Sequence, residues 1–128
     1  MTFIGRMGRA AAAVVAMLLI GTAAQAADTY IGPLLLQSVG VQQTPGATGH
    51  LVGNLEVKLR EPATLPTGMT CDKTYFTTKR ESDPDKRLFA LITAAHLAGK
   101  PVTLQISDDP SLRAYPGRCS LLWVEVLP

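Results

Sequence analysis

The stretch from Ser82 to Ile106, SDPDKRLFALITAAHLAGKPVTLQI, decides the fold because it predicts a helix, a stop and a strand in direct succession. Ser82 or Asp83 can accept hydrogen bonds from the first free backbone N–H groups of a helix. With Asp83 as the N-cap, Pro84 falls at the first helical position, where its missing N–H costs nothing. We therefore expect a helix that begins at Pro84.

The apolar residues of this helix form a stripe that repeats with the helical period. Gly99 suits the left-handed residue after the last turn, and Pro101 prevents continuation. The other sides are also largely apolar, so the helix is expected either between its sheet and loops or between its sheet and a neighbouring subunit. The stripe consists of Leu88, Leu91, Ile92, Ala95 and Ala98.

Segments typical of β-strands lie on both sides of the helix. The alternation of apolar and polar side chains is clearest in residues 51–60, as in a strand with one buried face. Ala27 to Tyr30 is expected to be a loose terminus, and Gly40 to mark a bulge or bend. The expected strands cover residues 34–41, 51–60, 69–78, 102–107 and 119–127.

The resulting order, β-β-β-α-β-β, predicts a mainly β fold with one helix. This order matches an OB-fold-like five-stranded barrel, in which the helix closes one end. An α+β sandwich, with the helix laid across an open antiparallel sheet, fits the same order.

The first 26 residues are predicted to be a secretory signal peptide. A positively charged start leads into an unbroken apolar run, and small residues before Ala27 give a cleavage signal. The run is too short to span a bilayer, which needs roughly 20 residues. We expect residues 27–128 to form a single periplasmic or secreted domain with no membrane segment after cleavage. The features of the signal are Arg6 and Arg9, residues 10–20, and Ala24 with Ala26.

Cleavage would also change the charge of the protein. The full sequence has 12 Lys and Arg against 10 Asp and Glu, and residues 1–26 contain two of the basic residues and no acidic one. The mature chain is therefore left with 10 of each and is formally neutral. A neutral domain lacks the electrostatic footprint of a nucleic-acid-binding protein. Nucleic acid is therefore not an expected partner.

Cys71 and Cys119 are the two cysteines of the chain. An even pair in an exported protein most often forms one disulfide. In the chain-entropy model, closing a loop of this length stabilises the fold by roughly 4 kcal/mol. The alternative is a metal or catalytic thiol, but two Cys and two His without tight spacing make a poor zinc site. We expect a disulfide, and neither a metal nor a cofactor.

Two patterns in the chain resemble a known protein family. One is the run from Lys86 to Leu104, and the other is Cys119 leading into the last strand. Together they are similar to small exported bacterial proteins of the type of the subtilase cytotoxin B subunit, over roughly residues 69–127. The resemblance implies an OB-fold, assembly into AB5-type pentamers and binding of cell-surface glycans. It assigns no individual ligand-binding residue, and the glycan expectation rests on fold-level analogy.

The residues themselves supply candidates for a glycan site. An aromatic ring can stack on a sugar face while hydroxyl and carboxylate groups bind its hydroxyls. Such rings are more often part of the core. Trp123 is ambiguous because it faces away from Leu122 and Val124 in an alternating strand. The candidate ligand-binding residues are Tyr75, Trp123, Tyr115, Asp72, Thr74 and Thr77.

No nucleophile elbow, phosphate loop or His-Glu-x-x-His pair is present, so the chain is not expected to be an enzyme. The first hypothesis is an exported binding protein for an extracellular glycan, oligomeric like AB5 toxin B subunits. The alternative is a monomeric periplasmic structural or inhibitor-like domain that binds a protein partner. A small hydrolase would need His50 or His96 to converge with a carboxylate or hydroxyl. Asp108 and Asp109 are interpreted as an ordinary turn.

Overall fold

The computed structural model describes residues 26–46 and 50–128. The predicted signal peptide, residues 1–26, lies outside the described residues apart from Ala26. In the described part of the chain, no helix is long and apolar enough to cross a membrane.

Strands and one α-helix make up the regular structure of the described residues. A short 3-10 helix precedes the α-helix. In chain order the elements are β1 (Asp28–Leu34), β2 (Leu36–Val41), β3 (Leu55–Leu59), β4 (Tyr75–Thr78), η1 (Arg80–Ser82), α1 (Arg87–Leu97), β5 (Val102–Ser107) and β6 (Ser120–Val126).

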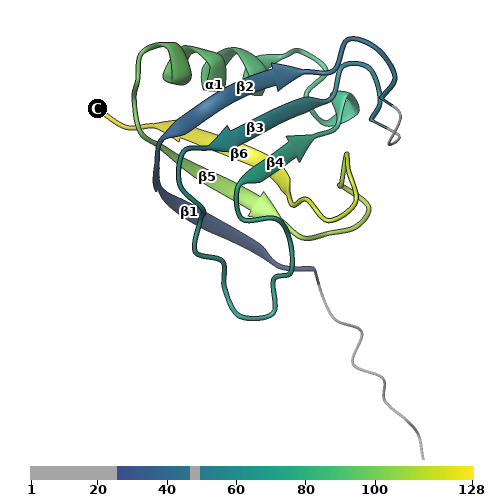
Figure 1. Cartoon of the computed structure of the whole chain (residues 1–128), viewed down its shortest axis with the longest axis horizontal. Helices are drawn as coiled ribbons and strands as arrows, with labels where there is room; N and C mark the ends of the chain where they lie inside the picture. The colour runs from purple at the N-terminus through teal and green to yellow at the C-terminus, as the bar shows by residue number, and fades with distance from the viewer. Residues whose placement is uncertain (1–25, 47–49) are drawn as a thin grey trace, which may run out of the picture.

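Within the described residues, the strands form a six-stranded sheet in the order β1-β5-β6-β4-β3-β2. Neighbouring strands are antiparallel except β4 and β6, which are parallel. Leu35 alone separates β1 from β2, yet these two strands lie at opposite ends of the order (Figure 1). One N-terminal segment therefore pairs with β5 through its first half and with β3 through its second.

The prediction of a mainly β fold with one helix is confirmed, but the expectation of five strands is wrong. The segment Ala27–Tyr30, expected to be loose, lies largely in β1. It pairs with β5 because Ile31, opposite Leu104, places an apolar side chain in the core. The expected irregularity at Gly40 is also misplaced. Gly40 pairs with Glu56, and the register shift lies between Leu36 and Ser38.

Two predicted strands are shorter than expected because turns occupy their first halves. At the start of 51–60, the Asn54 N–H donates to the Leu51 carbonyl at 3.2 Å, and Gly53 adopts a left-handed φ of 89°. In 69–78, the Asp72 carboxylate accepts the backbone N–H groups of Thr74 and Tyr75 at 2.7 and 2.9 Å. Such an Asx-type turn competes with strand pairing, so β4 begins only at Tyr75.

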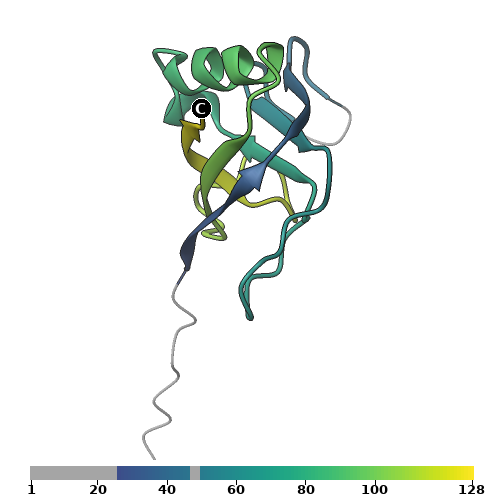
Figure 2. The ribbon, with the colours of Figure 1, turned by 90° about the vertical axis from the view of Figure 1, so that its left-hand side faces the viewer.

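The helix α1 lies across one end of the sheet and packs against β2 and β6 (Figure 2). Ile92 and Ala95 are its buried residues, whereas Leu91 and Leu97 are 45% and 80% exposed. Within one chain the helix is therefore covered on one face only. The core beneath it consists mainly of Leu36, Leu55, Val57, Leu59, Phe76, Val102, Leu104, Ile106, Leu121 and Val124.

The helix begins later than expected. Asp83 does bind free N–H groups, since its carboxylate oxygens accept from Leu88 and Phe89 at 3.1 and 3.0 Å. However, Pro84 is not the first helical residue, because the N-cap is Lys86 in a left-handed conformation with φ 57°. The chain turns between Asp83 and Lys86, and this turn lets the buried Asp83 carboxylate reach the first N–H groups of the helix. The end of the helix is as predicted, because Gly99 adopts the left-handed conformation with a φ of 64°.

Candidate functional site

Polar and aromatic side chains gather on the outer face of β3 and β4, opposite the core face that holds Val57 and Phe76. The β2–β3 and β5–β6 loops add further residues, and both loops reach the same end of the sheet (Figure 1). The members are His50, Glu56, Lys58, Tyr75, Tyr115 and Arg118, and we call them the aromatic–arginine cluster.

Arg118 is the centre of this cluster. Its guanidinium carbon lies 4.6 Å from the centroid of the Tyr75 ring and 4.7 Å from that of Tyr115. The same guanidinium forms an ion pair with the Glu56 carboxylate. Arginine favours such sites because its flat guanidinium can stack on aromatic faces and bind a carboxylate with its edge. These contacts hold three segments of the chain in one fixed arrangement.

The cluster is extended on both sides. The His50 ring stacks on Tyr115 with centroids 4.3 Å apart and planes inclined by 18°. On the other side, Lys58 Nζ lies 5.3 Å from the centroid of Tyr75. All these side chains are half-buried, so each presents only part of its surface to solvent. The result is a row of flat groups with charged groups beside it.

The disulfide holds the loop of Arg118 against the segment that leads into β4. The predicted pairing is confirmed, since Cys71 and Cys119 are bonded with their Cα atoms 5.5 Å apart. Next to the disulfide, the Asp72 N–H donates to the Gly117 carbonyl at 2.8 Å. Arg118 lies between these two fastened positions. The disulfide therefore places the guanidinium as well as stabilising the fold.

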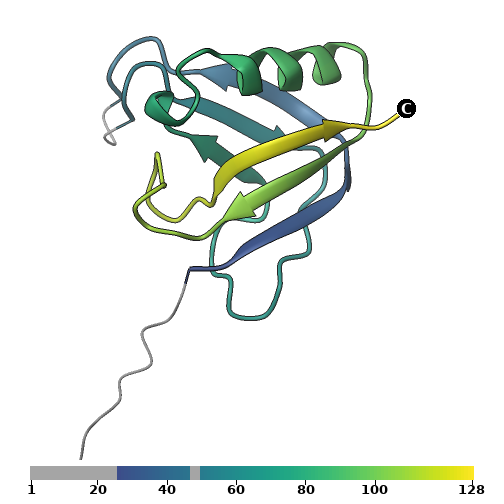
Figure 3. The same cartoon turned by 180° about the vertical axis from the view of Figure 1, so that it is seen from behind.

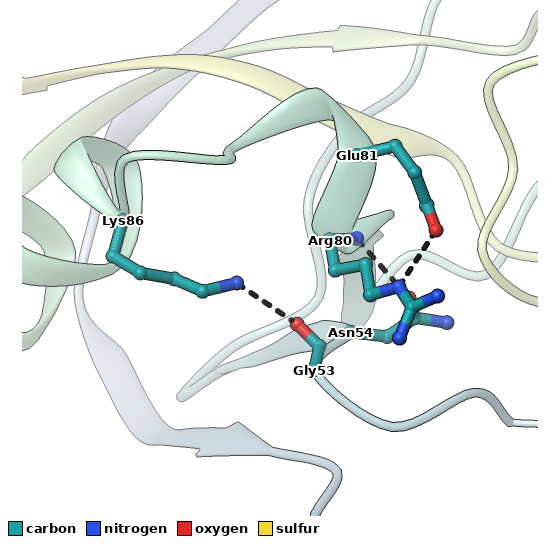
Figure 4. Close-up of polar contacts among 5 residues, drawn as sticks. All are labelled: Gly53, Asn54, Arg80, Glu81 and Lys86. Atoms are coloured by element: carbon teal, nitrogen blue, oxygen red, sulfur yellow. Dashed lines mark hydrogen bonds and ion pairs between the residues drawn. The ribbon is translucent and has the colours of Figure 1, made fainter.

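A small polar hollow of about 190 Å³ adjoins the cluster and shares His50 and Glu56 with it. Asn54 also lines the hollow and is almost fully buried. Its Oδ1 accepts the Arg80 backbone N–H at 3.2 Å (Figure 4), whereas its Nδ2 has no hydrogen-bond partner among the described residues. A buried donor without a partner is costly. Asn54 therefore lines the hollow with a buried donor that no described residue satisfies.

The segment before α1 contacts Gly53 and Asn54, next to this hollow. Lys86 Nζ donates to the Gly53 carbonyl at 3.4 Å, and Arg80 Nε pairs with Glu81 at 2.8 Å (Figure 4). The hydrogen bond from Arg80 lowers the pKa of the Glu81 carboxyl below its usual range. Glu81 is exposed and lies outside the cluster. These contacts link the β2–β3 loop to the start of the helix.

The structure separates the predicted ligand-binding residues into groups. Tyr75 and Tyr115 come together in the cluster through Arg118. Asp72 lies beside them, and its carboxylate is occupied by the backbone N–H groups of Thr74 and Tyr75. The half-buried Thr74 belongs to this turn. Thr77 is 0% exposed, so it presents no surface of its own to a ligand.

Trp123 lies at a different surface. Its ring packs edge to face against Tyr30 of β1, with centroids 5.6 Å apart. It also lines a mainly apolar groove of about 360 Å³ between α1 and β6, together with Leu88, Leu91 and Leu122. Leu91 and Trp123 leave 45% and 41% of their surface exposed there. The molecule therefore has a polar aromatic surface and a separate apolar one.

Sequence reasoning missed Arg118, Glu56 and His50 as site residues. Glu56 resembles any polar residue of an alternating strand, and His50 entered only the hydrolase hypothesis. Arg118 had a usable signal, because it directly precedes Cys119. A disulfide to Cys71 brings that loop to the segment that carries Tyr75.

The hydrolase hypothesis requires a histidine close to a carboxylate or hydroxyl, and His50 lines the polar hollow together with Glu56. His50 stacks on Tyr115, and His96 is a half-buried residue of the last turn of α1. Among the described residues, no group of three or more His, Cys, Asp or Glu side chains could hold a metal ion.

Comparison of the chain with protein-family models, with curated proteins and with solved structures gives no match.

Proposed function

We propose that this chain is an exported, non-catalytic binding protein with an OB-fold-like barrel, and that the aromatic–arginine cluster binds a glycan. The strand order supports the barrel. A continuous N-terminal segment that pairs with β5 at one end of the sheet and with β3 at the other brings the two edges toward each other. The connection of β4 to β5 through α1 is that of an OB-fold.

The position of the cluster supports a binding role. OB-folds bind oligosaccharides and oligonucleotides on the face of their second and third strands, between two flanking loops. In the proposed barrel, β3 and β4 take these two places, and the β2–β3 and β5–β6 loops flank them. The cluster lies on this face. This step is fold-level analogy, and the chemistry of the side chains has to carry the choice of ligand.

The stack of Tyr75, Arg118 and Tyr115 is the observation that carries the glycan proposal. Flat groups held in fixed positions suit the apolar face of a sugar ring, and the polar hollow beside them offers partners for hydroxyl groups. The expected neutral charge of the mature chain argues against an oligonucleotide, whose binding depends on neutralised phosphates. The ion pair with Glu56 also occupies the guanidinium of Arg118, which a phosphate would otherwise bind.

Export and assembly complete the proposal. The cleavage signal before Ala27 and the Cys71–Cys119 disulfide both fit the periplasm or the extracellular space. The exposed apolar side of α1, with Leu91 and Leu97, supports contact with further copies of the chain. A closed ring of about five chains, as in AB5 toxin B subunits, is expected to show in the solution mass.

A glycan array tests the binding proposal with the mature chain and two variants. We expect Tyr75→Ala to lower the affinity for the best glycan about tenfold or more, because it removes a central flat group. Trp123→Ala, which removes an aromatic ring from the other surface, should leave that affinity unchanged. Equal binding by wild type and Tyr75→Ala would overturn the proposed site, and the absence of any bound glycan would overturn the ligand class.

The second candidate is a monomeric exported domain that binds a protein partner. The groove between α1 and β6 favours it, because Leu88, Leu91 and Trp123 present apolar surface there. In this case the mature chain would have the mass of one subunit. Partner binding would then depend on Trp123 and not on Tyr75.

A further inference from the structure

A side chain of the loop that follows β5 forms a hydrogen bond with the residue before β1. The Ala27 backbone N–H donates to Asp108 Oδ1 at 2.7 Å, and the Asp108 N–H donates to the Ala27 carbonyl at 3.2 Å. These bonds follow directly on the pair Asp28 and Ser107. Figure 3 shows the start of β1 beside the end of β5. The last backbone N–H at this end of the β1–β5 pair therefore donates to a side-chain carboxylate and not to a backbone carbonyl.

This ending differs from an ordinary antiparallel pair. In such a pair, two opposite residues exchange both of their backbone N–H···O bonds. Here the carbonyl of Asp108 instead accepts from Arg113 Nη2 at 3.0 Å. The carboxylate takes the place of that carbonyl opposite Ala27. A carboxylate is the stronger acceptor, above all for a donor that carries positive charge.

The predicted cleavage site lies at this same position. The pattern Ala24-x-Ala26 predicts cleavage of the bond between Ala26 and Ala27. Both of these alanines are exposed, and they line an open hollow of about 420 Å³ together with Asp108. Hydrolysis of that bond would remove no residue of the β1–β5 ladder. It would convert the Ala27 N–H into an α-amino group, which is protonated at neutral pH.

We propose that removal of residues 1–26 creates an α-ammonium group at Ala27 that pairs with the Asp108 carboxylate and fastens the mature N-terminus to β5. The step consumes one water. The carbonyl of Ala26 becomes a carboxylate, and the freed amine of Ala27 takes up a proton. Asp108 thus has a role that an ordinary turn residue lacks. The processing half of this proposal rests on the proposed export.

The pairing is tested with chains released from a fusion partner so that they begin either at Ala27 or at two added glycines before Ala27. The added glycines move the ammonium away but keep the Ala27 N–H. We expect the extended chain to melt about 2–4 °C lower, as for a partly exposed ion pair in a domain of this size. With Asp108→Asn the two chain ends should melt at the same temperature. Asp28→Asn removes a neighbouring charge without this contact and should retain the difference.

Equal melting of the two wild-type chain ends would overturn the pairing, and so would an equal difference in Asp108→Asn. The processing half is tested by the mass of the protein recovered after expression of the full chain in a bacterium. The mass of a chain that begins at Ala27 supports cleavage at the predicted bond, and the mass of a chain with a different first residue overturns it. Failure of export itself would show separately, as an unprocessed chain in the cytoplasm. Neither measurement involves a glycan.

Discussion

The guanidinium of Arg118 lies 4.6 Å from the centroid of the Tyr75 ring, and this contact joins the β5–β6 loop to β4. Two residues that are far apart in the sequence thus form one flat surface. The ion pair with Glu56 holds the guanidinium from the side of β3. The proposed glycan site depends on this arrangement.

Arg118→Lys tests the need for a flat cation in the cluster. Lysine keeps the charge but cannot stack or form the same planar contacts. We expect glycan affinity to fall by about 3- to 10-fold, the range for the loss of one such stacking interaction. Isothermal titration calorimetry measures it, with Arg60→Lys on an exposed loop as the control. Unchanged affinity in Arg118→Lys would show that stacking by Arg118 does not contribute.

The double variant Cys71→Ser with Cys119→Ser tests the disulfide. We expect the free energy of unfolding to fall by about 2–4 kcal/mol, since the bond restricts the unfolded chain. Glycan affinity should fall as well, because the bond holds the loop that carries Arg118. Urea unfolding and a binding titration measure the two effects. Full affinity in a folded double variant would contradict the positioning role.

Leu104→Ala tests the core. Leu104 is fully buried between β1 and β6, so its truncation leaves a cavity. We expect a loss of about 2–5 kcal/mol in the free energy of unfolding. Leu97→Ala removes the same atoms from a side chain that is 80% exposed within one chain, and in an unassembled chain it should change stability by less than about 0.5 kcal/mol. Similar losses in both variants would mean that Leu97 is covered in solution, as in an oligomer.

Asp83→Ala tests the start of α1. The variant leaves the N–H groups of Leu88 and Phe89 without their carboxylate. We expect the free energy of unfolding to fall by about 1–2 kcal/mol, as for the loss of a helix cap. Asp85→Ala removes only an exposed ion pair with Arg87 and should cost far less. Equal effects would show that the two carboxylates act through charge alone.

The sequence was sufficient for features that depend on local pattern. The strand after Pro101, the stop at Gly99 and the disulfide each follow from residue types at short range or from simple counting. The start of α1 was only partly predictable. Asp83 binds helix N–H groups as expected, but the left-handed Lys86 that delays the helix has no clear sequence signal.

Features that depend on pairing between distant segments were not predictable. Nothing in residues 28–34 shows that β5 will accept them as a partner. The register between β5 and β6 shifts between Gln105 and Ile106, so that Ile106 pairs with Leu121 and Gln105 with Trp123. Leu121 therefore turns into the core, although simple alternation places it on the side of Trp123.

In the candidate site too, residue types were predictable from the sequence, whereas their positions relative to one another were not. Tyr75 and Tyr115 could be selected as aromatic residues in or beside strands, but their separation from Trp123 depends on the folded sheet. Thr77 was a reasonable choice by composition, yet the interior position of β4 between β3 and β6 buries it. The position of Arg118 beside Tyr75 depends on the Cys71–Cys119 disulfide.

The most direct test of the central claim is an NMR titration of the ¹⁵N-labelled mature chain with the glycan that binds best on an array. The account predicts that the amide signals that shift belong to Asn54, Tyr75, Tyr115, Gly117 and Arg118. The signals of Leu91 and Trp123 should stay in place. Shifts concentrated at Leu91 and Trp123, or no shifts at saturating glycan, would contradict the claim that the aromatic–arginine cluster is the binding site.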